Sequence, residues 1–446
     1  MEVSTIPVPS KYNLKTANAW AFYDWANSVY PLVITTAIFP IFYENLTSVT
    51  LGETIHDSVF FFSMSFKNTE IYSYVIAFSF LIVSVISPLL SGIADYTGSK
   101  KKFMKFFCYL GALSCASLYF FDVARLEWGL FSVMMASIGF WGSLIFYNAF
   151  LPEIAPPEDH DRLSAKGYSL GYIGSSILLI LNLIVIMNYE IFGFENAHQP
   201  TQYAFLTVGL WWIGFAQVTF ARLPDNQINR KPNGNNVVFK GFQELKKVWG
   251  ELNDTPRLKR FLAAFFIYSM AVQTIMLMAV LFGKKEVKGM EDANLIISVL
   301  IIQFIAVGGA YLFSWLSSKI GNIKALGSAV FIWILICLGT YFFVYEAFHF
   351  YFAAAAVGLV MGGIQSLSRS TYSKLLPKTT DNASYFSFYE ILEKLGIVIG
   401  MFSFGFIEGF TGSMRNSILA LITFFVIGFI LLLRIPKSKA VNPEIA

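Results

Sequence analysis

Twelve apolar runs, each about the length of a membrane-spanning helix, constrain the fold of this 446-residue chain more than any other feature. A helix needs about 20 apolar residues to cross a bilayer, and backbone in lipid must satisfy its polar groups within helices or closed barrels. Only 13% of the residues are charged, against about 25% in soluble domains. We therefore predict an all-α, multi-pass membrane protein with helices near residues 18–45, 72–95, 103–123, 127–151, 165–189, 202–222, 259–282, 293–317, 323–345, 349–373, 384–408 and 415–434.

The basic residues predict the orientation of these helices. Most of the 32 Lys and Arg residues fall before the first run, after the last run, or in alternate loops between runs. Cytoplasmic loops of membrane proteins carry such an excess of Lys and Arg, so we expect both chain ends in the cytoplasm. No signal peptide precedes the first run, which we expect to remain in the mature protein.

The longest cytoplasmic connection divides the runs six and six. We expect an N-terminal six-helix bundle (1–222), a cytoplasmic linker (223–258) and a C-terminal six-helix bundle (259–446). Within the linker, five apolar residues spaced by four and three share one helical face: Val238, Phe242, Leu245, Trp249 and Leu252. This amphipathic helix lies either on the anionic membrane surface or against the protein's own loops. The outer loop 46–71 is long, and its sequence suggests no role.

The two halves contain an internal repeat. The segment Ser91–Lys102 after the second run and the segment Ser314–Lys324 after the eighth share serine and glycine positions at an offset of about half the chain. A Leu-Pro pair also follows both the fourth and the tenth run. Repeats in two six-helix halves are typical of transporters that bind substrate between the halves.

Polar residues share one face of the first run. Asp24 is followed at the helical spacings of three and four by Asn27 and Ser28. A charge in the middle of a membrane helix costs roughly 2.5–3.5 kcal/mol, so this face should look toward other helices or a water-filled cavity. The alternative is that Asp24 caps the helix or pairs with a lysine at the membrane surface.

A second group of charges lies in the tenth and eleventh runs. Gln365 and Arg369 are four residues apart, and Glu390 can pair with Lys394 at the same spacing. By depth these charges and Asp24 fall in the cytoplasmic half of the membrane. They either close a cytoplasmic gate, receive a charged substrate, or form a fixed structural network.

The loop after the second run has the composition of a conformational switch. Asp95 can accept hydrogen bonds from the free N–H groups of a neighbouring helix, or pair with a cation such as Arg162. Gly98 supplies a turn, and the basic residues that follow include Lys100 and Lys101. On topology alone, these lysines fix orientation, and both roles are compatible.

Catalytic and cofactor chemistry is not indicated. The three cysteines lie in apolar runs without metal-ligand spacing, and no phosphate-binding loop occurs. Gly167–Gly171 matches the hydrolase nucleophile pattern literally, but it opens a membrane helix and is better explained by small-residue packing. We predict no enzyme activity, no cofactor and no metal site.

Four segments together resemble one known family: Tyr23–Ser28, Tyr147–Glu153, Gly171–Ser175 and Gln365–Ser370. They are similar to the vacuole-effluxer-like branch of the major facilitator superfamily, and the resemblance covers nearly the whole chain. It implies a secondary transporter with the first, fourth, seventh and tenth helices around a central cavity. Eukaryotic members are associated with amino-acid efflux from the vacuole. The usual helix-4 arginine and helix-5 Gly-Pro pattern are absent, which leaves coupling ion and direction open.

We therefore predict a monomeric transporter of the bacterial inner membrane that moves a small polar solute, such as an amino acid, by alternating access. A coupling proton or other ion is compatible with this prediction; nucleic acid is not a partner. The alternative is a transport-inactive membrane sensor of the same fold. The predicted substrate cavity contains Asp24, Asn27, Ser28, Tyr147, Asn148, Gln365 and Arg369. The predicted conformational switch contains Asp95, Gly98, Lys100, Lys101, Arg162, Glu390 and Lys394.

Overall fold

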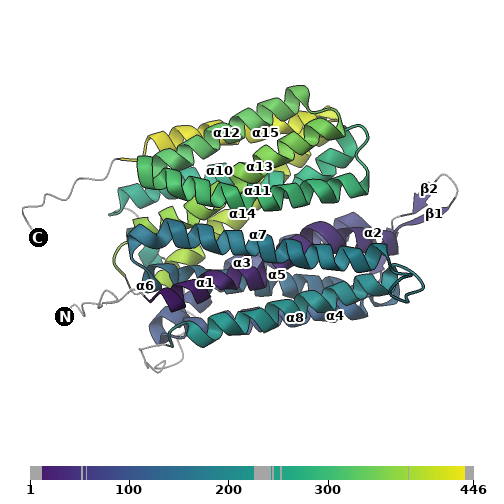
Figure 1. The fold of residues 1–446 in the computed structure, drawn as a ribbon, viewed down its shortest axis with the longest axis horizontal. Coiled ribbons are helices and arrows are strands. Elements are labelled where there is room, and N and C mark those ends of the chain that lie inside the picture. Colours follow the sequence, from purple (N-terminus) through teal and green to yellow (C-terminus); the bar gives the residue numbers. More distant parts are fainter. Residues whose placement is uncertain are drawn as a thin grey trace, which may run out of the picture.

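In the computed structural model, two groups of long helices lie side by side (Figure 1). The structure describes residues 13–51, 54–56, 58–225, 243, 246–251, 254–379 and 381–436. The N-terminal group contains α1 (Leu14–Asn27), η1 (Tyr30–Ile38), α2 (Phe39–Thr47), α3 (Asn68–Thr97), α4 (Lys100–Ser117), α5 (Leu126–Ala149), α7 (His160–Met187) and α8 (His198–Arg222). The C-terminal group contains α10 (Pro256–Glu286), α11 (Asp292–Ile320), α12 (Asn322–Phe343), α13 (Ala347–Leu375), α14 (Asn382–Thr411) and α15 (Met414–Leu433).

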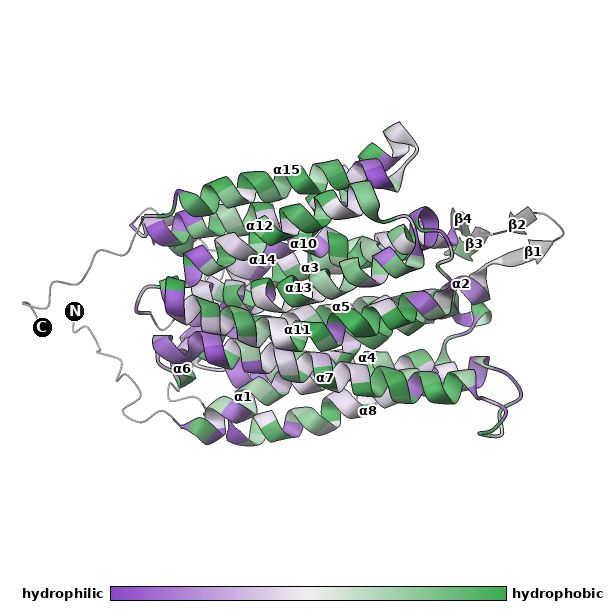
Figure 2. Cartoon of the chain, turned by 45° about the horizontal axis from the view of Figure 1, so that its top comes forward, coloured by the Kyte–Doolittle hydropathy of each residue, from purple (hydrophilic) through white to green (hydrophobic). Residues whose placement is uncertain are grey.

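Short elements connect the long helices at the two ends of the molecule. The "α6 end" is where α1 begins, α15 ends and the short helix α6 (Leu151–Ile154) lies; the opposite end carries β-hairpins and is called the "hairpin end" (Figure 1). The remaining short elements are η2 (Leu118–Phe120), η3 (Val123–Arg125) and η4 (Pro157–Asp159). Hydrophobic residues occupy much of the length of the helices, and hydrophilic residues gather near both ends of the molecule (Figure 2). A helix that crosses a bilayer needs such an apolar middle.

Eleven helical runs of the described chain are long and apolar enough to cross a membrane, and each matches a predicted run. The twelfth prediction, 384–408, corresponds to α14, which has 30 residues but is not among those eleven. Its middle carries Glu390, Glu393 and Lys394. Because α14 packs against α3, α5, α10 and α15, these charged residues can contact neighbouring helices and avoid lipid.

The first predicted helix is interrupted by a wider turn. Residues Tyr30–Ile38 form a π-helix between α1 and α2. Pro31 has no N–H to donate, which weakens regular helical pairing at this point. The hydroxyl of Thr36 donates to the Pro31 carbonyl at 2.8 Å, five residues back. The spanning helix predicted near 18–45 is therefore confirmed, with a π-helical middle segment that the sequence did not predict.

The outer loop 46–71 contains regular structure that the sequence did not predict. The strands β1 (Val49–Leu51) and β2 (Thr54–His56) form one antiparallel hairpin, and β3 (Ser58–Phe61) and β4 (Met64–Lys67) form a second. The turn of the second hairpin places Phe62 and Ser63 at positive φ angles of 44° and 65°.

The internal repeat is visible in the backbone. Gly98 ends α3 with φ 66°, and Gly321 ends α11 with φ 86°. Both angles lie in the region that side chains disfavour and glycine tolerates. The second helix of each group therefore ends at the α6 end on a glycine with positive φ, as the repeated motif predicted, although ψ differs between them (28° at Gly98 and 153° at Gly321).

The linker is described only in part. Val238, Phe242, Leu245 and Leu252 of the predicted amphipathic face lie outside the described residues. Residues 246–251 are helical and lie against α14, where Lys247 pairs with Asp381 at 2.5 Å and the Trp249 ring contacts Phe388. This piece therefore packs on the protein itself, one of the two predicted arrangements.

Candidate functional site

Asp95 joins the two helix groups at the α6 end. Its carboxylate accepts hydrogen bonds from the Ala383 and Ser384 backbone N–H groups at 3.2 and 2.8 Å, and from the Ser384 hydroxyl at 2.8 Å. These groups open α14, where a helix has unpaired N–H groups and a positive dipole end. We predicted that Asp95 accepts hydrogen bonds from the N–H groups of a neighbouring helix, and this geometry matches that prediction.

Lys100 completes the contact. Its ammonium lies 3.1 Å from the Asp95 carboxylate and also pairs with Glu153, which accepts a hydrogen bond from Asn382 of α14 at 3.0 Å. Lys100 is buried. The cation found beside Asp95 is thus Lys100, whereas the sequence suggested a cation such as Arg162.

A second contact at the α6 end has the reverse arrangement. Asp161, at the start of α7, accepts from Ser317 of α11 at 2.7 Å, from Asn322 at 2.7 Å and from Lys374 at 2.6 Å. In both contacts the end of the second helix of one group meets the start of the fifth helix of the other. The acid lies on the second helix in one case and on the fifth in the other.

Two further predicted switch residues, Lys101 and Arg162, lie at the edges of these contacts. Lys101 donates to the Leu223 carbonyl at 2.8 Å and pairs with Asp225 at 2.7 Å, so it ties α4 to the end of α8. The hydrogen bond from Lys101 lowers the pKa of the exposed Asp225 carboxyl. Arg162 pairs with Asp159 at 3.4 Å.

A buried ion pair joins the groups in the half of the helices nearer the α6 end. Arg369 of α13 lies 3.1 Å from the Asp24 carboxylate of α1, and the two side chains are 2% and 7% exposed. The same carboxylate oxygen accepts from the Tyr147 hydroxyl at 2.9 Å. Arg369 also donates to the Ser164 hydroxyl at 2.9 Å and to its carbonyl at 3.0 Å. Asp24 thus pairs inside the protein with an arginine, and the alternatives of a cap or a surface lysine are wrong.

Aromatic rings surround the Arg369 guanidinium. Its central carbon lies 5.0 Å from the Trp20 ring centroid, 5.4 Å from Tyr147 and 4.2 Å from Tyr168. Such contacts attract a cation through the ring quadrupole and exclude water. Gly167 lets α7 approach the pair, because a Cβ there would lie 2.4 Å from the Asp24 carboxylate. The small-residue explanation of Gly167 is in keeping with this contact.

A second charge cluster lies on α14. Lys394 pairs with Glu390 at 2.6 Å and with Glu393 at 3.0 Å, and its ammonium lies 3.4 Å from the Trp141 ring centroid. The predicted Glu390–Lys394 pair is therefore formed. Glu390 also accepts from Asn148 at 3.0 Å, and Asn148 accepts from Arg369 at 3.4 Å.

The remaining predicted cavity residues lie about one turn nearer the hairpin end. Gln365 of α13 accepts from the Tyr172 hydroxyl of α7 at 2.5 Å, a further bond between the groups. Ser28 donates to Asn27 at 3.4 Å. The Asn27 amide nitrogen is buried and has no partner in the described part of the chain. Five of the seven predicted residues thus make contacts across the junction of the two groups, whereas the contacts of Asn27 and Ser28 lie within the N-terminal group.

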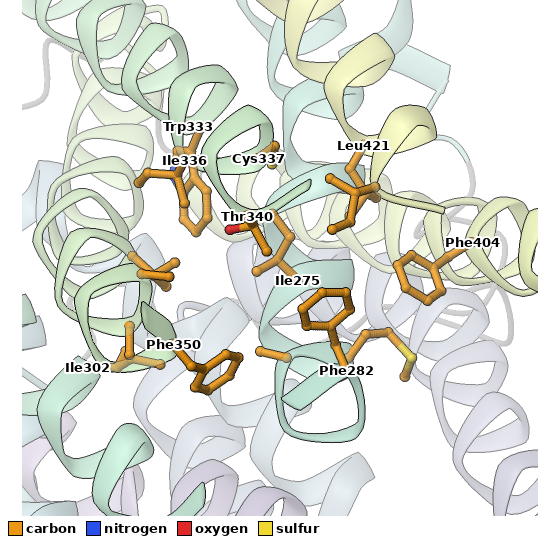
Figure 3. Close-up of a pocket in the computed structure, with 16 residues that line it drawn as sticks. Ile275, Phe282, Ile302, Trp333, Ile336, Cys337, Thr340, Phe350, Phe404 and Leu421 are labelled. Carbon is orange, nitrogen blue, oxygen red and sulfur yellow. The ribbon is translucent and has the colours of Figure 1, made fainter. Parts of the chain in front are cut away.

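These residues form a packed network, and two pockets in the described part of the chain lie elsewhere. One is apolar and enclosed by helices of the C-terminal group, between side chains such as Phe282, Trp333 and Phe404 (Figure 3). The other lies at the α6 end beside Asp161 and Arg162. Neither pocket is lined by Asp24 or Arg369, the residues of the predicted substrate cavity, whose side chains are almost fully buried in this structure.

Sequence reasoning missed several residues of the network. Ser164 and Tyr168 carry no charge and sit among other small and aromatic residues, so nothing in their pattern marked them. Asp161 and Lys374 could have been found from the repeat. A contact between the second helix of one half and the fifth helix of the other implies a symmetry-related contact.

Two groups of long helices in the described chain, a glycine at the end of the second helix of each group and buried charges at the junction are the features of a membrane transporter of the major facilitator type. Solved structures of this fold agree in architecture. The fucose transporter FucP in its outward conformation matches with a TM-score of 0.66 and 15% identity, covering 96% of this chain and 100% of that one. The human organic anion transporter MFSD10 matches with a TM-score of 0.68 and 11% identity, covering 94% and 98%.

The chain belongs to the vacuole effluxer Atg22-like family, whose model matches residues 13–444. It is 31% identical over 430 residues to the uncharacterized MFS-type transporter YxiO of Bacillus subtilis, covering 96% of each chain. It is 25% identical over 507 residues to autophagy-related protein 22 of Saccharomyces cerevisiae, covering 97% of this chain and 93% of the relative. The family resemblance inferred from the four motifs is confirmed.

Proposed function

We propose that this chain carries a small polar solute, with amino acids as the first candidates, across a membrane by alternating access. The observation that carries the proposal is the buried Asp24–Arg369 pair between the two helix groups. A membrane protein keeps such charges inside the bilayer only at a cost. A pair that joins two moving bodies can be broken and remade during transport, which accounts for its position.

The contacts between the groups suggest which end opens. In the described part of the chain, hydrogen bonds join the two helix groups at the α6 end, through Asp95 and Asp161. Others join them up to the level of the Tyr172–Gln365 bond. In this arrangement the α6 end is locked, so the binding site would exchange solute at the hairpin end, where an exported solute would leave. The basic residues favour the α6 end as the cytoplasmic one.

The chemistry near the junction suits a zwitterionic or polar solute. Gln365, Gln273 and Glu393 are only partly buried, and Gln273 donates to Glu393 at 2.7 Å. Glu393 can accept from a substrate ammonium group, while Arg369 offers a charged donor to a substrate carboxylate once its aspartate is displaced. Efflux, named in the family description, and a bacterial inner membrane, the setting that fits the Bacillus relative, are parts of the same proposal.

Ligand-dependent thermal stability of the purified protein tests the proposal. A ligand that binds the native state at about 100 times its Kd adds about 2.7 kcal/mol of stability. A panel of amino acids, dipeptides and organic acids should contain a stabilising compound. Its effect should vanish in Arg369→Gln, which removes the donor to a substrate carboxylate, and persist in the control Lys102→Gln, which alters an exposed residue at the α6 end. A hit that binds Arg369→Gln equally well would place the solute elsewhere.

A further inference from the structure

We propose that Asn148 is a positioning residue that couples the Asp24–Arg369 pair to the Glu390–Glu393–Lys394 cluster. The inference rests on the proposed transport function. It concerns how a change in one buried cluster is communicated to the other.

The geometry of Asn148 carries the inference. Its side-chain oxygen accepts from Arg369 at 3.4 Å, and its side-chain nitrogen donates to Glu390 at 3.0 Å. The residue is 5% exposed and lies on α5, whereas both partners lie on helices of the C-terminal group. An uncharged amide supplies one acceptor and two donors on a single planar group. One side chain of the N-terminal group thus holds a cation and an anion of the C-terminal group together.

The charge balance of the two clusters indicates what is coupled. Three carboxylates, Asp24, Glu390 and Glu393, face two cations, Arg369 and Lys394. With all five ionised, the buried set carries one excess negative charge, which is unfavourable in a membrane interior. A proton taken from water by the Glu390–Glu393 pair cancels that charge.

Side chains from the neighbouring helices surround the Glu390–Glu393 pair. Asn148 and Trp141 of α5 contact the cluster directly, as does Gln273 of α10. Near the pair, further charged or titratable groups are Tyr168 of α7, Tyr268 of α10, Tyr389 of α14, Arg369 and Asp24. At the two ends of α14, Asp95 of α3 binds its first turn and Arg415 of α15 contacts Glu286.

The consequence for the transport cycle is direct. When the groups separate at the α6 end, Asn148 leaves Arg369 and Glu390 in one movement. Glu390 then loses a neutral donor and keeps only Lys394, which Glu393 shares. Exchange of the proton at this pair is thereby tied to release of the Asp24–Arg369 contact.

The test is an exchange of chemical groups between two positions. Asn148→Asp keeps the acceptor for Arg369 but sets a carboxylate against Glu390, so one of the two acids must bind a proton. Its apparent Tm should match wild type near about pH 5 and fall by roughly 5 °C or more near about pH 9. The double variant N148D/E390Q swaps amide and carboxylate, restores the hydrogen bond and should remove this pH dependence.

Two outcomes would overturn the coupling role. They are a loss in Asn148→Asp that is equal at both pH values, and a double variant as sensitive to alkali as the single one. If Asn148→Asp does not fold, proton uptake after an acid shift decides the matter. By indicator dye, wild type should bind about one proton more than E390Q/E393Q, and equal uptake would refute the shared proton. Neither readout needs a substrate, so failure of transport would affect the proposed function alone.

Discussion

Neutralising Asp24 should shift the conformational equilibrium toward a state open at the α6 end. Asp24→Asn keeps the size of the side chain but removes the charge opposite Arg369, at a site where both side chains are almost fully buried. Removing one partner of a buried ion pair costs about 3–5 kcal/mol, because the other charge is left uncompensated.

The magnitude follows from the contacts that remain. Arg369 keeps Ser164, Asn148 and its three aromatic rings, so we take the lower value of about 3 kcal/mol. The partners lie in different helix groups, and only the closed state contains the pair. At about 1.4 kcal/mol per factor of ten, the closed-to-open ratio should fall roughly 100-fold.

Distances between two spin labels measure this shift. Lys102 and Lys319 are exposed, lie at the α6 end and belong to different helix groups. The three native cysteines are buried and should label poorly. Asp24→Asn should move the distance distribution to longer values, and the uncharged pair D24N/R369Q should move it back toward wild type. An unchanged distribution in Asp24→Asn, or a double variant more open than both single variants, would refute the reasoning.

Three further outcomes are expected. Gly167→Ala places a carbon 2.4 Å from the Asp24 carboxylate and should open the α6 end in the same distance measurement, whereas Gly214→Ala, with nothing within 4 Å, should have no effect; equal effects would contradict the close approach. Asp95→Asn removes charge-assisted bonds worth about 1.5–3 kcal/mol each, so amide hydrogen exchange in the first turn of α14 should accelerate, and unchanged exchange would contradict that role. A cysteine at Lys319 should react with an impermeant reagent in inside-out vesicles; reaction only in right-side-out vesicles would reverse the predicted orientation.

Local patterns predicted most of the fold. Apolar runs located the helices because lipid imposes length and composition on every spanning segment. The Glu390–Lys394 pair followed from helical spacing alone. The π-helical turn at Tyr30–Ile38 could not be predicted from local pattern, because a single proline in an apolar run shows only that one backbone N–H is missing.

Long-range pairing in the site could not be predicted in the same way. Asp24 and Arg369 were recognised as buried charges, but nothing in their local patterns states that they meet across the junction. The uncharged partners Ser164 and Tyr168 carry no pattern that separates a site residue from a packing residue. Asp24 and Arg369, which we expected to line a substrate cavity, are almost fully buried in this conformation. A single sequence does not specify which conformation the structure shows.

Uptake of the stabilising solute into liposomes that contain the purified protein tests the central claim most directly. The account predicts saturable uptake by wild type and by the control Lys102→Gln, and none by Arg369→Gln when equal amounts of folded protein are present. Full uptake by Arg369→Gln would contradict the claim that transport depends on the buried Asp24–Arg369 pair.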